Sequence, residues 1–168
     1  MDYDLPLGDF SEQDMAVMKS FIEGKDGVYL EVGVKHGKSL AFARRYFKGK
    51  VYGIDIKDRA DKLDENYDFG DTIFIDLSSN EAAPHWNEKI DVLFIDGDHS
   101  YQGVKDDWNN FSPFVKKGGV VVFHDCDEVG PDVVKLSKEV AGKDGWGELV
   151  KHKKDGLNTS IASVRREK

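Results

Sequence analysis

The sequence predicts an α/β fold in which a seven-stranded, mostly parallel sheet carries helices on both faces. The first observation is a short apolar run that contains or ends in an acidic residue and recurs five times: VYLEV (28–32), VYGIDI (51–56), TIFID (72–76), DVLFID (91–96) and VVVFHD (120–125). Runs that are apolar without alternation are typical of buried parallel strands. The second observation is that segments with helical spacing of apolar residues separate most of these runs.

Four segments have the spacing and the end signals of helices: 11–24, 39–47, 102–111 and 131–142. In the first, Ser11 is the expected N-cap, Asp14 follows three residues later, and Gly24 can end the helix. In the last, Pro131 occupies the first turn. The charged segment 58–71 is compatible with either a loop or a frayed helix.

The end of the chain departs from this alternation. ELVKH (148–152) and TSIASV (159–164) are strand-like, and the turn-forming KKDG, with Asp155 and Gly156, lies between them. We therefore expect the sheet to finish in a C-terminal hairpin with at least one antiparallel strand.

Composition limits the partners. The 32 acidic and 24 basic residues give a net charge of -8, which repels phosphate backbones, so we expect no nucleic acid but a small-molecule partner. No apolar run could cross a bilayer, and MDYDLPLGDF lacks the basic and apolar regions of a signal peptide, so we expect no membrane association. Cys126 is the only cysteine, which excludes an internal disulfide and favours a cytoplasmic location.

The carboxyl ends of the strands are where ligands bind in open α/β sheets. Gly33 and Gly37 follow the first strand, where they allow a tight turn and let a ligand lie against amides at the start of a helix. Asp55 ends the second strand, where a carboxylate can accept hydrogen bonds from both hydroxyls of a ribose. The loop is not G-x-G-x-x-G, which argues against a nicotinamide dinucleotide. An adenosine-type ligand fits better, although glycine pairs and strand-end aspartates also occur in simple turns.

The segment EVGVKHGKS (31–39) resembles the E-x-G-x-x-x-G-x-S first motif of class I S-adenosylmethionine-dependent methyltransferases. IDGDHSY (95–101) and the GG…HD segment (118–125) are similar to the small O-methyltransferase-like branch of that family, the Methyltransferase_24 type. The resemblance implies a Rossmann-like sheet with an antiparallel last strand. The length of 168 residues and the lack of a Pro- or Ser-rich linker predict a single domain, and with the resemblance we expect one methyltransferase domain over residues 1–168, with an N-terminal helix region (1–27), a cofactor-binding core (28–125), and a helix and terminal β-hairpin (126–168).

The resemblance implies S-adenosylmethionine as the cofactor. Glu31 and the 33–37 loop would hold its amino-acid end, Asp55 its ribose, and Asp76 with Ser78 its adenine. The full set expected to bind the cofactor is Glu31, Gly33, Val34, Gly37, Ser39, Asp55, Ile56, Asp76, Leu77, Ser78 and Asp96.

Methyl transfer is an in-line displacement that requires an aligned and nucleophilic acceptor. Asp96, Asp98 and His99 follow the fourth strand, and His124 and Asp125 end the fifth, so adjacent strands would bring them into one mouth. We take His99, Asp96 and His124 as the catalytic candidates. In one mechanism His99 or His124, with His99 preferred, removes the proton of the acceptor. Either histidine can instead be purely structural.

The second mechanism uses a divalent cation such as Mg²⁺ or Mn²⁺. In metal-dependent relatives the ligands are acidic or amide residues, and their positions correspond here to Asp96, His124 and Asp125. An imidazole at position 124 departs from that pattern. It either shifts the preference toward Mn²⁺, Fe²⁺ or Zn²⁺ or indicates that no metal binds.

The expected function is O-methylation of a small-molecule hydroxyl, on a phenol, a sugar or a secondary metabolite. With little chain available for a lid, we expect the acceptor site to be open or to be completed by a second subunit in a homodimer. The alternatives are a non-catalytic module that binds S-adenosylmethionine or S-adenosylhomocysteine, and an NAD-linked oxidoreductase.

Overall fold

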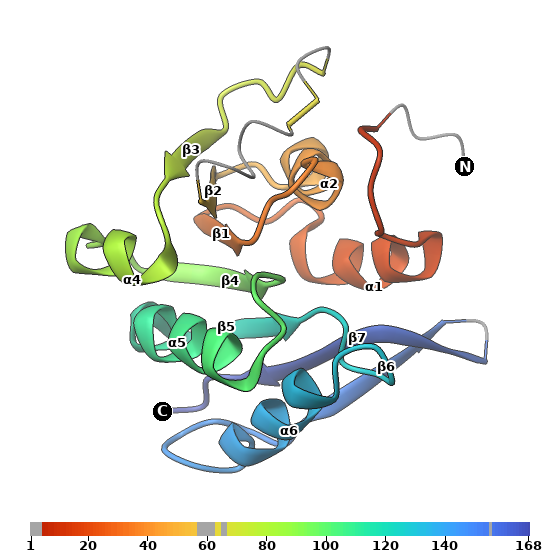
Figure 1. The fold of residues 1–168 in the computed structure, drawn as a ribbon, viewed down its shortest axis with the longest axis vertical. Coiled ribbons are helices and arrows are strands. Elements are labelled where there is room, and N and C mark those ends of the chain that lie inside the picture. Colours follow the sequence, from red (N-terminus) through yellow and green to blue (C-terminus); the bar gives the residue numbers. More distant parts are fainter. Residues whose placement is uncertain (1–4, 57–62, 65–66, 155) are drawn as a thin grey trace.

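The computed structural model describes residues 5–56, 63–64, 67–154 and 156–168, and all that follows concerns these residues. One seven-stranded sheet with the order β3-β2-β1-β4-β5-β7-β6 runs through the molecule (Figure 1). Its strands are β1 (Val28–Val32), β2 (Lys50–Asp55), β3 (Ile73–Asp76), β4 (Ile90–Ile95), β5 (Val115–Phe123), β6 (Val150–Lys154) and β7 (Leu157–Arg165). Strands β1 to β5 pair in parallel, whereas β7 is antiparallel to both β5 and β6. The predicted mostly parallel sheet with a terminal antiparallel hairpin is confirmed.

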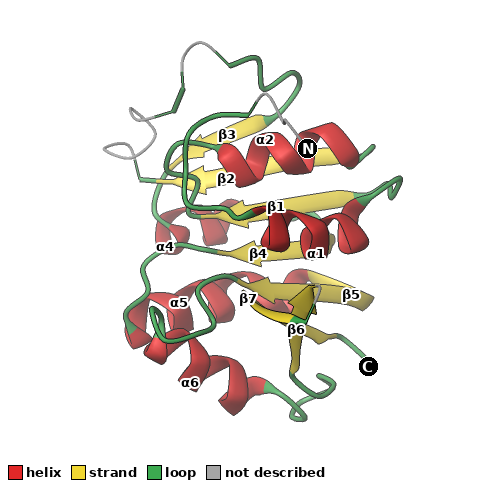
Figure 2. Cartoon of the chain, turned by 90° about the vertical axis from the view of Figure 1, so that its right-hand side faces the viewer, coloured by secondary structure: helices red, strands yellow, loops and turns green. Residues whose placement is uncertain are grey.

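Helices lie on both sides of this sheet (Figure 2). The α-helices are α1 (Glu12–Ile22), α2 (Lys38–Tyr46), α4 (Ser79–Ala82), α5 (Tyr101–Phe111) and α6 (Pro131–Val140), and two 3-10 turns span Ala83–His85 and Ser112–Phe114. The first helix begins as predicted, because Ser11 and Asp14 form a complete capping box.

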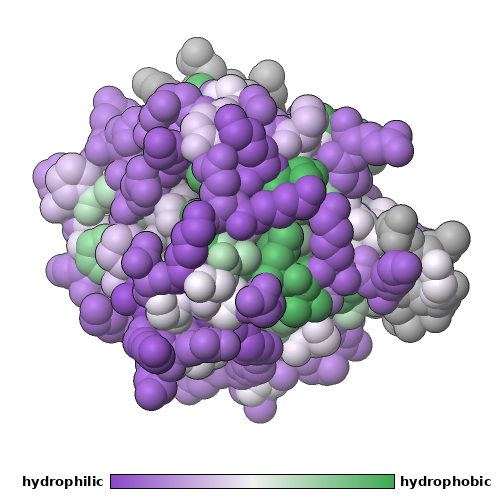
Figure 3. Space-filling model, turned by 90° about the horizontal axis from the view of Figure 1, so that it is seen from below, coloured by the Kyte–Doolittle hydropathy of each residue, from purple (hydrophilic) through white to green (hydrophobic). Residues whose placement is uncertain are grey.

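Two hydrophobic clusters fill the space between the sheet and its helices. Alternate residues of β1 point to opposite faces, so Leu30 packs with α5 and α6 while Tyr29 packs with α1 and α2. Trp108, which lies in the segment 102–111 that was predicted to be helical, is buried in the first cluster. On the side that carries α6 the surface is mainly hydrophilic, and the largest apolar area lies near the middle of the view (Figure 3).

Three sequence-based expectations need correction or limits. β3 is not a buried strand: it lies at the edge of the sheet, where one long side has no neighbouring strand among the described residues, and Ile73 is exposed. β5 begins at Val115 rather than at Val120, because the KKGG stretch, exposed from Lys116 to Gly118, continues the strand through an irregularity in its pairing with β4. In the segment 58–71, residues 58–62 and 65–66 lie outside the described residues, and the rest form bends and turns.

The parallel register brings the strand ends together at one edge of the sheet. Val32 lies beside Ile54 on one side and Ile95 on the other, and Ile95 lies beside Phe123. The residues that follow these four strand positions therefore form one continuous rim. Among the described helices, none is long and apolar enough to cross a membrane.

Candidate functional site

The loop after β1 turns sharply because glycine adopts a left-handed conformation at both ends. Gly33 has φ of +88°, and a Cβ atom there would lie 2.2 Å from the carbonyl oxygen of Asp96. Gly37, the N-cap of α2, has φ of +86°. At position 33 only glycine can adopt this left-handed conformation and also let the end of β1 lie so close to the loop that follows β4.

The carboxylate of Asp55 organises this loop. Its Oδ2 accepts hydrogen bonds from the backbone N–H of Val34 at 2.7 Å and of Lys35 at 2.8 Å. Its Oδ1 accepts a third from the backbone N–H of Ile56 at 2.8 Å. Three of the roughly four hydrogen-bonding sites of a carboxylate are therefore occupied within the chain.

A first cavity of about 310 Å³ opens beside Asp55. The ends of β1 and β2, the start of α4 and the first turns of α5 form its walls. Ile56 and Leu77, two of the exposed large apolar side chains, both line it. This cavity thus combines an anchored carboxylate with apolar walls.

A second cavity of about 650 Å³ adjoins the first, since Gly33, Gly97 and Asp98 line both. Its walls come from residues 7–10, the loop 33–39 and the ends of β4 and β5. All five of the polar residues that follow β4 and β5 line this second cavity: Asp96, Asp98, His99, His124 and Asp125. The expectation that these five side chains meet in one mouth is confirmed.

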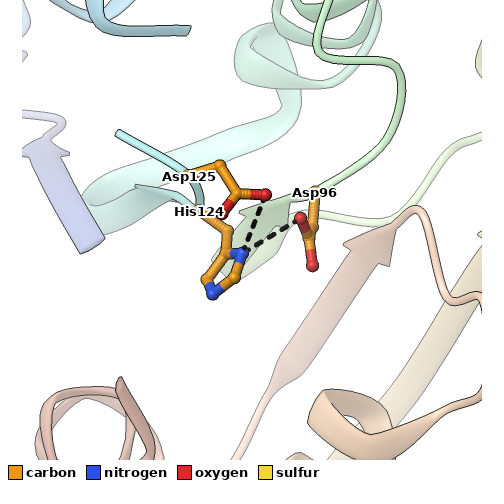
Figure 4. Close-up of side chains that lie close together, drawn as sticks. All are labelled: Asp96, His124 and Asp125. Carbon is orange, nitrogen blue, oxygen red and sulfur yellow. Dashed lines mark ion pairs between the residues drawn. The ribbon is translucent and has the colours of Figure 1, made fainter. Parts of the chain in front are cut away.

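The two histidines flank the two carboxylates. His124 Nδ1 lies 3.2 Å from Asp96 Oδ1 and 3.5 Å from Asp125 Oδ2 (Figure 4). His99 Nε2 approaches the same two oxygens, at 3.5 Å and 3.3 Å. The side chain of His99 is 39% exposed and that of His124 only 4%. Of the two, His99 is therefore the one that an acceptor in the cavity can readily reach.

In this cluster the histidines and the aspartates stabilise one another's charged forms. A hydrogen bond with Asp96 raises the pKa of His99, and one with His124 lowers the pKa of Asp125. Burial alone would lower the pKa of His124, but its contacts with Asp125, Asp14 and Asp96 outweigh burial and raise that pKa to about 12.

A divalent cation fits the donor atoms present once His124 gives up the proton of Nδ1. One oxygen each of Asp96 and Asp125 and one nitrogen of His124 lie within 4.8 Å of one another. Nδ1 of His124 is buried and has no well-aligned hydrogen-bond partner among the described residues. Two carboxylates with one imidazole form a mixed donor set, which suits Mn²⁺, Fe²⁺ or Zn²⁺ better than Mg²⁺.

Two of the residues predicted to bind the cofactor line neither cavity. Glu31 is fully buried, accepts hydrogen bonds from Tyr29 Oη at 2.7 Å and Ser39 Oγ at 2.6 Å, and has its pKa raised to about 8 by burial. Asp76 is exposed at the end of β3. The roles predicted for both residues in holding the cofactor stay predictions.

Sequence reasoning missed Asp107, which is buried on α5, lines the first cavity and has its pKa raised to about 6 by burial. The signal was present, because Asp107 falls at helical spacing on the apolar face that carries Val104, Trp108 and Phe111. It also missed that Asp14, beyond capping α1, approaches His124 Nε2 at 3.7 Å. Only the tertiary fold brings that pair together.

Comparison with known proteins identifies the family. A family model described as a methyltransferase domain matches residues 30–126, which include every residue that lines the first cavity and most of those that line the second. The chain belongs to this class I methyltransferase family. The resemblance of the glycine loop and of the IDGDHSY and HD segments is thereby confirmed.

One curated relative of this methyltransferase domain is the uncharacterized protein R132 of Acanthamoeba polyphaga mimivirus, 33% identical over 148 residues. The match covers 72% of the chain and 64% of the viral protein. Among solved structures, an O-methyltransferase from Bacillus cereus in complex with SAH has a TM-score of 0.67 at 15% identity and covers 96% of this chain and 84% of that one. An rRNA methylase from Streptococcus thermophilus also has a TM-score of 0.67, at 11% identity, with 92% and 94% covered. Likeness at such identity shows the fold alone.

Proposed function

We propose that this domain binds S-adenosylmethionine and transfers its methyl group to a hydroxyl of a small acceptor such as a phenol or a sugar. The observation that carries the proposal is the junction of the two cavities at Gly33, Gly97 and Asp98. One cavity offers a carboxylate and apolar walls, as a nucleoside requires. The other offers an acid and histidine cluster, as proton removal requires.

The first cavity supports a nucleoside pose in detail. The adenine ring would lie between the exposed side chains of Ile56 and Leu77, which lose solvent contact when a flat ring covers them. The ribose would lie at Asp55. Because three backbone N–H groups already occupy this carboxylate, we expect one ribose hydroxyl rather than both to donate to it.

The second cavity supports the chemistry. We assign His99 as the general base, because it is accessible and the carboxylates of Asp96 and Asp125 stabilise the imidazolium that forms when it takes the acceptor proton. A divalent cation held by Asp96, His124 and Asp125 would supply Lewis-acid polarisation of the acceptor oxygen. A net charge of -8 favours a small acceptor over RNA.

Titration calorimetry with S-adenosylmethionine and S-adenosylhomocysteine, followed by a methylation screen over hydroxyl acceptors with and without EDTA, tests the proposal. We expect binding of both nucleosides and formation of S-adenosylhomocysteine with at least one acceptor. A loss of activity in the presence of EDTA would indicate that the reaction requires the cation. Binding without turnover on any acceptor would favour a non-catalytic module, and binding of a nicotinamide dinucleotide instead would favour an oxidoreductase.

A further inference from the structure

The second cavity carries two apolar side chains that the proposed function does not use. Among the described residues, six large apolar side chains are exposed, and four of them line one of the two cavities. Ile56 and Leu77 belong to the first cavity, where the nucleoside would cover them. Leu7 and Val129 belong to the second cavity, and they are the most exposed of the six, at 83% and 73%. Exposed apolar side chains that gather around a cavity are typical of a ligand site.

Leu7 belongs to an N-terminal segment that is fastened to the start of α2. Nζ of Lys38 donates a hydrogen bond to the carbonyl oxygen of Gly8 at 3.0 Å. Phe10 is only 4% exposed, and its ring packs against two buried phenylalanine rings with centroid distances of 6.0 Å and 6.1 Å. The segment 7–10 is therefore a fixed wall of the second cavity, and Leu7 is held there although its side chain is uncovered.

Val129 belongs to the loop between β5 and α6, which is also held in place. Its backbone N–H donates a hydrogen bond to the carboxylate of Asp127 at 2.9 Å. Gly130 packs against the carbonyl oxygen of Asp125, which would lie only 2.2 Å from a Cβ atom at position 130. The two apolar side chains thus reach the same cavity from two separate segments, and one of these segments begins at the acid and histidine cluster.

Several polar side chains of the second cavity already have partners within the chain. Lys35 pairs with Asp9 at 2.9 Å. Asp98 accepts hydrogen bonds from the backbone N–H and the hydroxyl of Ser100, at 3.0 Å and 2.9 Å. An acceptor rich in hydroxyl groups would have to replace these contacts, whereas an acceptor with an apolar part gains free energy by covering the two exposed apolar side chains.

We propose that the acceptor is a hydroxyl compound with an apolar body, such as an alkyl-substituted phenol, and that Leu7 and Val129 select it over a sugar. Its hydroxyl lies at His99 and its apolar part at these two side chains. The cavity of about 650 Å³ is within the range of small-molecule sites, roughly 300–1,000 Å³. The role of the hydroxyl rests on the proposed function, whereas binding of the apolar body does not.

The test is an NMR titration of the full chain, labelled with carbon-13 at its leucine and valine methyl groups, with 4-ethylphenol, 4-butylphenol and methyl glucoside. We expect the alkylphenols to shift the methyl resonances of Leu7 and Val129. Those of Val150, an exposed valine that lines neither cavity, should stay unchanged. From 4-ethylphenol to 4-butylphenol the affinity should rise about 2- to 4-fold for each added CH₂. Methyl glucoside should shift none of these resonances.

Three variants with the same new residue extend this test. Leu7→Ser and Val129→Ser should each bind 4-butylphenol about 3- to 10-fold more weakly than the wild type, and the control Val150→Ser should bind it equally well. All three side chains are exposed, so the substitutions leave the core intact. Equal affinities of the four proteins, an affinity independent of chain length, or equal shifts with methyl glucoside would overturn the proposal.

Two further measurements separate this proposal from its alternatives. If concentrating the protein alone shifts the resonances of Leu7 and Val129, the two side chains contact a second copy and the proposal is wrong. Calorimetry with S-adenosylhomocysteine tests the proposed function separately. A protein that binds 4-butylphenol as expected but no S-adenosylhomocysteine would refute the proposed function and keep the apolar site, and the reverse result would refute the apolar site alone.

Discussion

Replacing Glu31 by glutamine should change how stability depends on pH. Glu31 is fully buried, and burial raises its pKa from an ordinary 4.5 to about 8. For an acid with a raised pKa in the folded state, the stabilising contribution is complete below the unfolded pKa and is lost as pH rises through the folded pKa. Glutamine keeps the shape of the side chain and has no charge to bury. The free energy of unfolding of Glu31→Gln relative to the wild type should therefore increase between pH 4.5 and 8.

The size of this increase follows from the pKa difference. At about 1.4 kcal/mol per unit, the shift corresponds to an upper limit on the order of 5 kcal/mol. Urea unfolding followed by tryptophan fluorescence at several pH values from 5 to 9 measures it, and titrations elsewhere in the chain cancel in the difference between the two proteins. Glu128→Gln, at an exposed position, is the matched control and should run parallel to the wild type. A difference between Glu31→Gln and the wild type that stays constant across this range would mean that burial does not raise the pKa of Glu31.

Three further variants test the loop and the cluster. Gly33→Ala places a Cβ atom 2.2 Å from a backbone oxygen at φ of +88° and should lower the free energy of unfolding by about 2–4 kcal/mol. Gly156→Ala is the control, because Gly156 has a similar φ of +81° but no atom within 4 Å of the added Cβ, and it should lower the free energy of unfolding by only about 1 kcal/mol. Equal unfolding midpoints for the two would contradict the steric argument. His99→Gln should slow methyl transfer by about 10²–10⁴-fold and leave cofactor affinity unchanged. The rate is measured as formation of S-adenosylhomocysteine, and a rate equal to that of the wild type would show that His99 is not the base. Asp107→Asn should stabilise the protein relative to the wild type as pH rises through about 6, because asparagine avoids a buried charge; urea unfolding measures this, and a flat difference would contradict it.

The strands could be predicted because each buried parallel strand is a short apolar run. The acidic residue at the end of such a run could then be placed at the end of the strand from its sequence position alone. Asp55 and Asp96 were placed correctly for this reason. The exposure of β3 could not be predicted, because Ile73 looks like a core residue until the strand order puts it at the edge of the sheet. The start of β5 at Val115 could not be predicted either, because the lysines and glycines that follow Val115 are not typical of a strand.

The site shows the same division between local and tertiary information. The meeting of His99 and His124 around two aspartates follows from the adjacency of β4 and β5, which the motif order implied. The burial of Glu31 and the approach of Asp14 to His124 depend on how α1, α2 and β7 pack over the sheet. No spacing in the sequence encodes a contact between residues 14, 124 and 160. Asp107 is an intermediate case. Its place on the apolar face of a helix could be predicted from the sequence, but its place in the wall of the first cavity could not.

The most direct test of the proposed nucleoside site is calorimetric binding of S-adenosylhomocysteine to the wild type, to Asp55→Asn and to Asp71→Asn. Asp71 is the control because its side chain is 86% exposed and pairs with Arg44, so the variant removes the same charge away from the cavities. We expect Asp71→Asn to bind like the wild type and Asp55→Asn to bind about 10- to 100-fold more weakly, because it loses charged hydrogen bonds to the loop and the ribose. No heat of binding to the wild type at millimolar ligand, or an unchanged affinity in Asp55→Asn, would contradict the proposed site.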